Sequence, residues 1–174
     1  MKRVILFFSL FVCSALASAQ NDAINRFFAT YMDDERFTVV FVSPKMFNIV
    51  SKISADDPEW EKFREVIGGL KGLRVLAAEA IENGNSLYKE ALGKVPAAEY
   101  EELVTVRDGK ENVRIWVKES GNIINELLLL VGAPDKFTLM SLTGKIDLDK
   151  ISSLTKGLDF EGVKHLDKLK NKEK

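Results

Sequence analysis

Carboxylates are the side chains of this sequence that are best suited to do chemistry. Five of them lie close together in the middle of the chain, on neighbouring predicted strands or just before them: Glu99, Glu101, Glu102, Glu111 and Glu126. Two carboxyl groups about 5–9 Å apart can act as acid and base, or as acid and nucleophile, in glycoside hydrolysis. Glu126 lies between apolar stretches, so we expect it to be partly buried in an ion pair with Arg114. A hydrolase or sugar-active enzyme that uses two carboxylates is therefore one alternative.

The other reactive side chains do not complete a catalytic or metal-binding pattern. Ser153 and Lys156 have the S-x-x-K spacing of penicillin-recognising enzymes, but the S-D-N and K-T-G elements of those enzymes are missing. His165 is the only histidine and cannot make a zinc or copper ligand set alone. The glycines of residues 68–72 follow a predicted helix, whereas phosphate loops open one. We predict no catalytic residue, cofactor or metal.

The first 19 residues have the pattern of a secretory signal. Lys2 and Arg3 precede an apolar run that is shorter than the roughly 20 residues needed to span a membrane. A small-residue cleavage site follows it: Ala17 and Ala19, before Gln20. We therefore expect residues 1–19 to be removed and residues 20–174 to work in the bacterial periplasm or outside the cell.

Cys13, the only cysteine, lies inside this leader. Lipoprotein signals carry small residues before the cysteine that receives the lipid, whereas Phe11 and Val12 precede Cys13. We expect Cys13 to be lost on cleavage, with a lipid tether through Cys13 as the alternative. The mature chain then has no thiol nucleophile, no disulfide and no thiolate metal site.

The composition indicates one globular domain that does not bind nucleic acid. The chain has 25 Lys and Arg against 26 Asp and Glu, and loss of Lys2 and Arg3 with the leader changes its formal charge from −1 to −3. Nucleic-acid-binding domains usually carry a basic stripe instead. A chain of this length can bury about 70% of its unfolded surface in one core. We expect a single domain over residues 20–174 that ends in a frayed, lysine-rich tail.

Helix and strand patterns alternate in the first half of the mature chain. Ser43 and Pro44 form a helix start, and the strand before them is apolar on both faces, which indicates a strand inside a sheet. The predicted elements are a helix over 21–32, a strand over 37–43, helices from 44 and from 58, a strand over 73–79 and a helix after 84. Because the two strands enclose helices, we expect them to be parallel or joined by a crossover.

The second half has the pattern of a four-strand meander. Asp108 and Gly109 predict a two-residue hairpin turn that pairs Arg107 with Lys110. The apolar face of this hairpin contains Val104, Val106, Val113, Ile115 and Val117. Leu103 and Trp116 fall on the polar face, where a loop or terminus covers them or they form an interaction surface. Further strands over 127–131 and 136–144 precede a helix that starts at Asp147.

These elements predict an α+β fold. We expect a mostly antiparallel sheet, built from a βααβα unit and then a four-strand meander, with helices packed on one face. We expect the first helix to give partial cover to the other face.

Two stretches resemble a known family. The segments VVFVSPKMF (39–47) and MSLTGKIDLDKISSL (140–154) are similar to an exported bacterial family of the Bacteroides group, catalogued as domain of unknown function 4252. The resemblance covers most of residues 22–170 and implies export and one domain. Some members look like lipoproteins, and the family implies no catalytic residues.

The function predicted from these observations is a non-enzymatic binding or interaction protein of the periplasm or envelope, whose partner is an unidentified protein or envelope component. The carboxylate-dependent hydrolase and an envelope stress or signalling component remain as alternatives.

Overall fold

The structure, a computed structural model, describes residues 23–147 apart from Ala55 and Asn122. The predicted leader with Cys13 and its cleavage site lies outside these residues. So do the helix predicted after Asp147, His165 and the lysine-rich tail.

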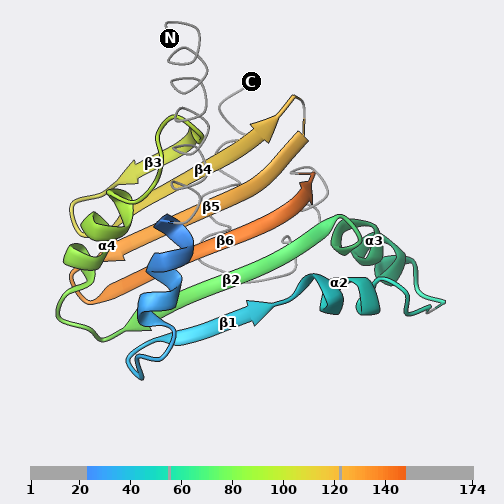
Figure 1. Cartoon of the computed structure of the whole chain (residues 1–174). Coiled ribbons are helices and arrows are strands. Elements are labelled where there is room, and N and C mark those ends of the chain that lie inside the picture. Colours follow the sequence, from blue (N-terminus) through green and yellow to red (C-terminus); the bar gives the residue numbers. More distant parts are fainter. Residues whose placement is uncertain (1–22, 55, 122, 148–174) are drawn as a thin grey trace, which may run out of the picture.

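Six strands form one sheet in the spatial order β1-β2-β6-β5-β4-β3 (Figure 1). Their bounds are Thr38–Val42 (β1), Leu70–Glu79 (β2), Glu101–Arg107 (β3), Asn112–Ser120 (β4), Ile123–Ala133 (β5) and Lys136–Ile146 (β6). Every neighbouring pair is antiparallel, and β3 to β6 follow one another as a meander. The predicted α+β fold is therefore confirmed.

The connection between the first two strands differs from the prediction. β1 and β2 are antiparallel neighbours, with Thr38 opposite Ala77 and Val42 opposite Leu73. The helices between them, α2 (Pro44–Val50) and α3 (Pro58–Ile67), lie beyond one end of the two strands (Figure 1). The expectation of parallel strands or a crossover is wrong, because the two short helices turn the chain back at the end of the sheet instead of crossing its face.

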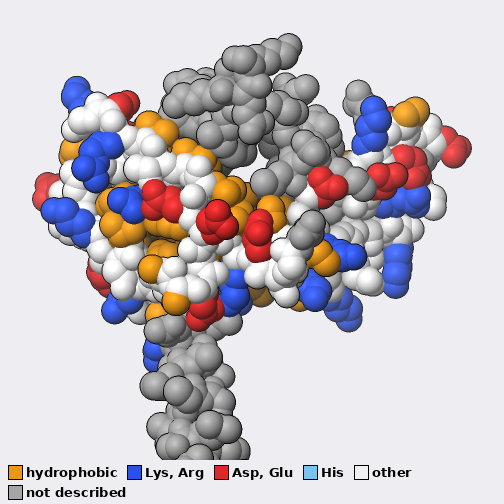
Figure 2. Space-filling view, turned by 90° about the horizontal axis from the view of Figure 1, so that it is seen from above, with side chains coloured by type: hydrophobic (Ala, Val, Ile, Leu, Met, Phe, Trp, Pro, Cys, Tyr) orange, Lys and Arg blue, Asp and Glu red, His pale blue; other side chains and the backbone are white. Residues whose placement is uncertain are grey.

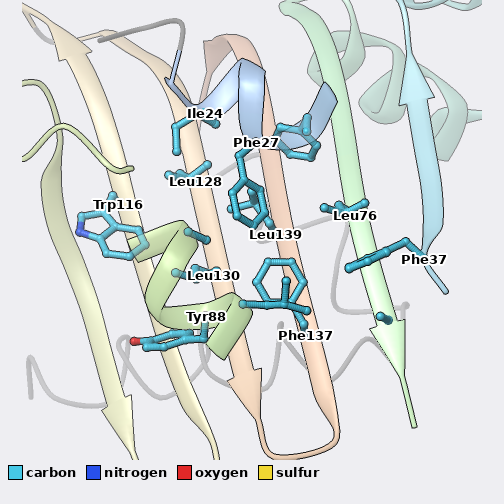
Figure 3. Close-up of a cluster of buried hydrophobic side chains, with 14 of the residues drawn as sticks. Ile24, Phe27, Phe37, Leu76, Tyr88, Trp116, Leu128, Leu130, Phe137 and Leu139 are labelled. Carbon is cyan, nitrogen blue, oxygen red and sulfur yellow. The ribbon is translucent and has the colours of Figure 1, made fainter. Parts of the chain in front are cut away.

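Two helices cover one face of the sheet: the helix over residues 23–31 and α4 (Gly84–Leu92) (Figure 1). Ile24 and Phe27 of the first helix point into a buried cluster with Leu128, Phe137 and Leu139 of the sheet (Figure 3). The apolar periodicity of this helix is thus confirmed. The prediction that this helix covers the other face of the sheet is wrong, because its aromatic side chains pack on the same face as α4.

The opposite face carries a second buried cluster. Among the described residues, every member of this cluster belongs to a strand: Val104, Val113, Ile115, Leu127, Leu129, Val131 and Ile146. Apolar side chains from β5 thus enter both clusters, which explains why its leucines run without a polar break.

The β3–β4 hairpin has a longer loop than predicted. Arg107 pairs with Asn112 and Val104 with Ile115, so four residues form the loop. The Asp108 carboxylate accepts a hydrogen bond from the Glu111 amide at 3.0 Å, which closes the turn. The predicted pairing is off by two residues. Because two residues are one full side-chain period of a strand, Val104 still lies on the apolar face.

α4 packs closely against the hairpin that joins β5 and β6. A Cβ atom on Gly84 would lie 2.2 Å from the Ala133 carbonyl oxygen and 2.5 Å from that of Lys136. A Cβ atom on Gly132 would lie 2.4 Å from the Cβ of Tyr88. Glycine at both positions lets the helix backbone approach the sheet to this distance.

Candidate functional site

The first strand lies at the edge of the sheet, where sequence reasoning did not place it. β1 has β2 on one side, and within the described residues no strand pairs with its other side. Phe41 is 63% exposed and Val39 is 40% exposed, and Val40 is similarly open. The prediction of a strand inside the sheet is therefore wrong. A strand that is apolar on both faces has the same pattern at an exposed edge as in the interior.

The exposure of apolar side chains continues into the segment after β1. Met46, Ile49 and Ile53 are each about half exposed. The helix α2 starts as predicted, with the Ser43 hydroxyl accepting the Met46 amide at 3.3 Å, but it has no buried residue. We call the exposed set the β1–α2 surface: Val39, Val40, Phe41, Met46, Ile49 and Ile53. Of the ten large apolar side chains exposed in the described part of the chain, seven lie between residues 39 and 63.

The two edges of the sheet are built differently. β1 has the sequence TVVFV and carries no charge, whereas β3 contains Glu101, Glu102 and Arg107 and a register shift after Glu102. Figure 2, seen from the β3 side, shows acidic and basic side chains among the hydrophobic ones there. Charges and bulges protect a strand edge from pairing with another chain. β3 has this protection, and β1 does not.

Phe41 is held in place by a charged neighbour. The Arg74 guanidinium lies 5.8 Å from the centre of the Phe41 ring, on the opposing position of β2. Arg74 also donates a hydrogen bond to the Asn25 side chain, on the helix over 23–31. A cation over an aromatic face stabilises the ring orientation. The contact with Arg74 therefore orients the exposed ring of Phe41.

The two side chains predicted as an interaction surface have different environments. Trp116 is only 5% exposed and belongs to the buried cluster under the two helices (Figure 3). Of the two alternatives for Trp116, this burial agrees with cover and not with an interaction surface, although helices give the cover instead of a loop or terminus. Leu103 is 39% exposed, at the register shift of β3, next to Glu102.

Three of the five predicted carboxylates are engaged with other side chains: Glu99, Glu102 and Glu126. The partly buried Glu126 accepts the Tyr100 hydroxyl at 2.8 Å and the Ser141 hydroxyl at 2.6 Å. Arg114 pairs with Glu102 at 2.9 Å, so the predicted ion pair between Glu126 and Arg114 is wrong. The strand register explains this, since Lys118 and not Arg114 is opposite Glu126. Lys118 itself pairs with Glu99.

The comparisons with known proteins give one match. A family model described as a domain of unknown function, DUF4252, matches residues 31–154. The chain belongs to the DUF4252 family. Searches of curated proteins and of solved structures gave no match. The matched region of this DUF4252 chain contains all six strands and the whole β1–α2 surface.

Neither a metal-ligand cluster nor a membrane-spanning helix is found in the described part of the DUF4252 chain. No three His, Cys, Asp or Glu side chains between residues 23 and 147 converge on a point where an ion could bind. No helix in the same stretch is long and apolar enough to cross a bilayer.

Tyr100 is expected to make the stability of the DUF4252 domain sensitive to alkaline pH. Burial, and then the neighbouring Glu126 carboxylate, raise the pKa of the Tyr100 phenol. The neutral phenol is therefore favoured in the folded state. The contribution of this neutral phenol to the free energy of unfolding is complete below the ordinary tyrosine pKa of about 10. Above that pH the contribution decreases by up to about 1.4 kcal/mol per pH unit. We expect Tyr100→Phe to remove this part of the slope in urea unfolding between pH 9 and 11.

At neutral pH the same variant loses the hydrogen bond to Glu126 and about 1–2 kcal/mol of stability. Ser141→Ala is the matched control, because it removes the other hydroxyl on Glu126 but no titrating group. An alkaline slope that is the same in Tyr100→Phe and in the unmodified protein would contradict the assignment.

Proposed function

We propose that this DUF4252 protein is a non-catalytic binding protein that acts in the periplasm or outside the cell after residues 1–19 are removed. We propose further that it binds a protein partner through the β1–α2 surface. The observation that supports this is the exposed apolar strand at an unprotected sheet edge, continued by the exposed apolar side chains of α2.

The free edge of β1 supports binding by strand addition. An extended segment that pairs with β1 gains main-chain hydrogen bonds along Thr38–Val42. Its alternate side chains can contact Val39 and Phe41 on one face of the sheet and Val40 on the other. Val39 and Phe41 lie on the face that carries the helix over 23–31, because they oppose Leu76 and Arg74 of β2.

The apolar character of the surface supports a protein partner. Soluble monomers seldom expose continuous apolar patches of more than a few hundred Å² unless the patch is functional. The six side chains of the β1–α2 surface expose on the order of 500 Å² in total, spread over both faces of the edge strand and along α2. A small polar ligand gains little from contact with such a surface.

The test places a photo-crosslinking amino acid, benzoylphenylalanine, at position 41 in cells that produce the protein. Position 103 is the matched control, because Leu103 is an exposed apolar residue on the opposite edge strand. We expect crosslinked protein adducts from position 41, at a yield several-fold above that from position 103. Mass spectrometry of the same purified protein is expected to find Gln20 as its first residue.

Equal or absent adducts at the two positions would contradict a binding role for β1. An acylated chain that starts at Cys13 would contradict release of the protein from the membrane.

A further inference from the structure

We infer that the partner on β1 is a second copy of this chain. This inference rests on the proposed function and names the partner of the same surface. Two copies pair their β1 strands antiparallel across a twofold axis, which joins the two six-stranded sheets into one continuous sheet.

The geometry of a strand that pairs with itself fits the sequence of β1. The strand has five residues, Thr38–Val42, so a twofold axis through its centre places Val40 opposite Val40 of the second copy. Val39 then lies opposite Phe41, and this contact occurs twice. Pairs of an aromatic and a β-branched side chain on opposing strands each stabilise a sheet by about 0.2–1 kcal/mol. β1 therefore supplies both side chains of each of these cross-strand contacts.

Charge also favours a second copy. The pairing strand carries no ionised side chain, so self-pairing brings no like charges together. The cation that precedes it, Arg36, is paired with Asp34 at 2.6 Å and the two charges cancel. β3 has an unpaired side in the described structure as well, but it carries charges and a register shift. β1 is therefore the edge that is suited to this contact.

The apolar area that two copies offer each other is close to the smallest that specific dimers use. α2 starts two residues after β1, so antiparallel pairing brings the α2 helix of each copy alongside the chain that precedes β1 in the other. The β1–α2 surfaces of two copies together expose on the order of 1,000 Å² of apolar area, which is near the lower limit for specific interfaces. Backbone atoms of the two edges add to this area.

The first arm of the test measures the mass of the purified protein by sedimentation velocity over a range of concentrations. We expect a dimer whose dissociation constant rises at least about 100-fold in Phe41→Glu, because the variant removes the aromatic ring from both Val39–Phe41 contacts and places a carboxylate opposite each valine. Phe41 is largely exposed in the single chain, so this variant is expected to fold. Leu103→Glu is the matched control and is expected to leave the dimer unchanged.

The second arm tests the register with single cysteines, in a Cys13→Ala background that contains no other cysteine. Under mild oxidation, Val40→Cys is expected to give a disulfide-linked dimer, because the two Cα atoms face each other across the axis. Thr38→Cys is expected to give much less, because Thr38 faces Val42 and its own copy lies roughly 13 Å away along the strand.

A protein that stays monomeric at high concentration, or a dimer that Phe41→Glu leaves intact, would overturn this inference. If the chain is monomeric while position 41 crosslinks to a different protein in cells, the proposed binding function stands and the second copy is excluded as its partner. If position 41 crosslinks to nothing and the chain is monomeric, both fail.

Discussion

Phe137→Ala is expected to lower the free energy of unfolding by about 3–5 kcal/mol. The Phe137 side chain is 0% exposed and lies at the centre of the helix-covered face (Figure 3). Its ring lies 5.8 Å from that of Phe27 and 6.2 Å from that of Phe37. One ring thus connects three parts of the chain: the helix over 23–31, the segment before β1, and β6. Removing it leaves a cavity that these elements cannot fill without moving.

This loss is a large fraction of the total free energy of unfolding that a domain of this size has. A domain is typically stable by about 5–15 kcal/mol, so the variant is expected to unfold at much lower urea concentration. Phe41→Ala is the matched control: it is the same chemical change on a ring that is 63% exposed, and is expected to stay within about 0.5 kcal/mol in dilute protein. Equal losses in the two variants would contradict the burial that the structure assigns to Phe137.

Gly84→Ala is expected to lower the free energy of unfolding by about 3 kcal/mol, at the upper end of the usual cost of overpacking. The added Cβ would meet two backbone carbonyl oxygens, of Ala133 and Lys136, at distances that no Cβ tolerates. Backbone cannot rotate away as a side chain can, and the Gly84 amide also donates to the Pro134 carbonyl at 3.3 Å. The N-terminal end of α4 would therefore have to move away from the sheet.

The matched control for this variant lies at the other end of the same helix. Gly93 has φ −68° and a new Cβ there would have its nearest neighbours at 3.5 Å, so Gly93→Ala is expected to gain about 0.4–1 kcal/mol. In thermal unfolding, Gly84→Ala should lower the midpoint by roughly 10 °C, whereas Gly93→Ala should raise it slightly. A decrease of similar size in both variants would show general intolerance of α4 to alanine instead of a specific close approach.

Local signals in the sequence predict most of the elements. Ser43 and Pro44 start α2, because a cap depends on residues that are adjacent in the chain, and Asn83 precedes α4 although its side chain makes no cap hydrogen bond. Alternation on β3 and β4 predicts which face is apolar even where the loop length is wrong. These features depend on a few neighbouring residues, and the sequence displays those neighbours directly.

The errors concern contacts between residues that are distant in sequence. β1 is apolar on both faces, and nothing within its five residues distinguishes a buried strand from an exposed edge strand. Trp116 alternates with the polar Arg114 and Lys118, so the pattern places it on the polar face, but helices distant in sequence cover the centre of that face. The partner of Glu126 depends on strand register, which in turn depends on the whole meander. The candidate site was missed for this reason.

The contrast between the two sheet edges has a consequence for how large an assembly can become. If both outer strands were bare and apolar, chains could add at each side without end and form filaments. If two chains pair through β1 as inferred above, the pair presents only β3 at its outer edges, with acidic and basic side chains and an irregular register. Growth would then stop after one addition, and the protein would reach high concentrations without polymerising.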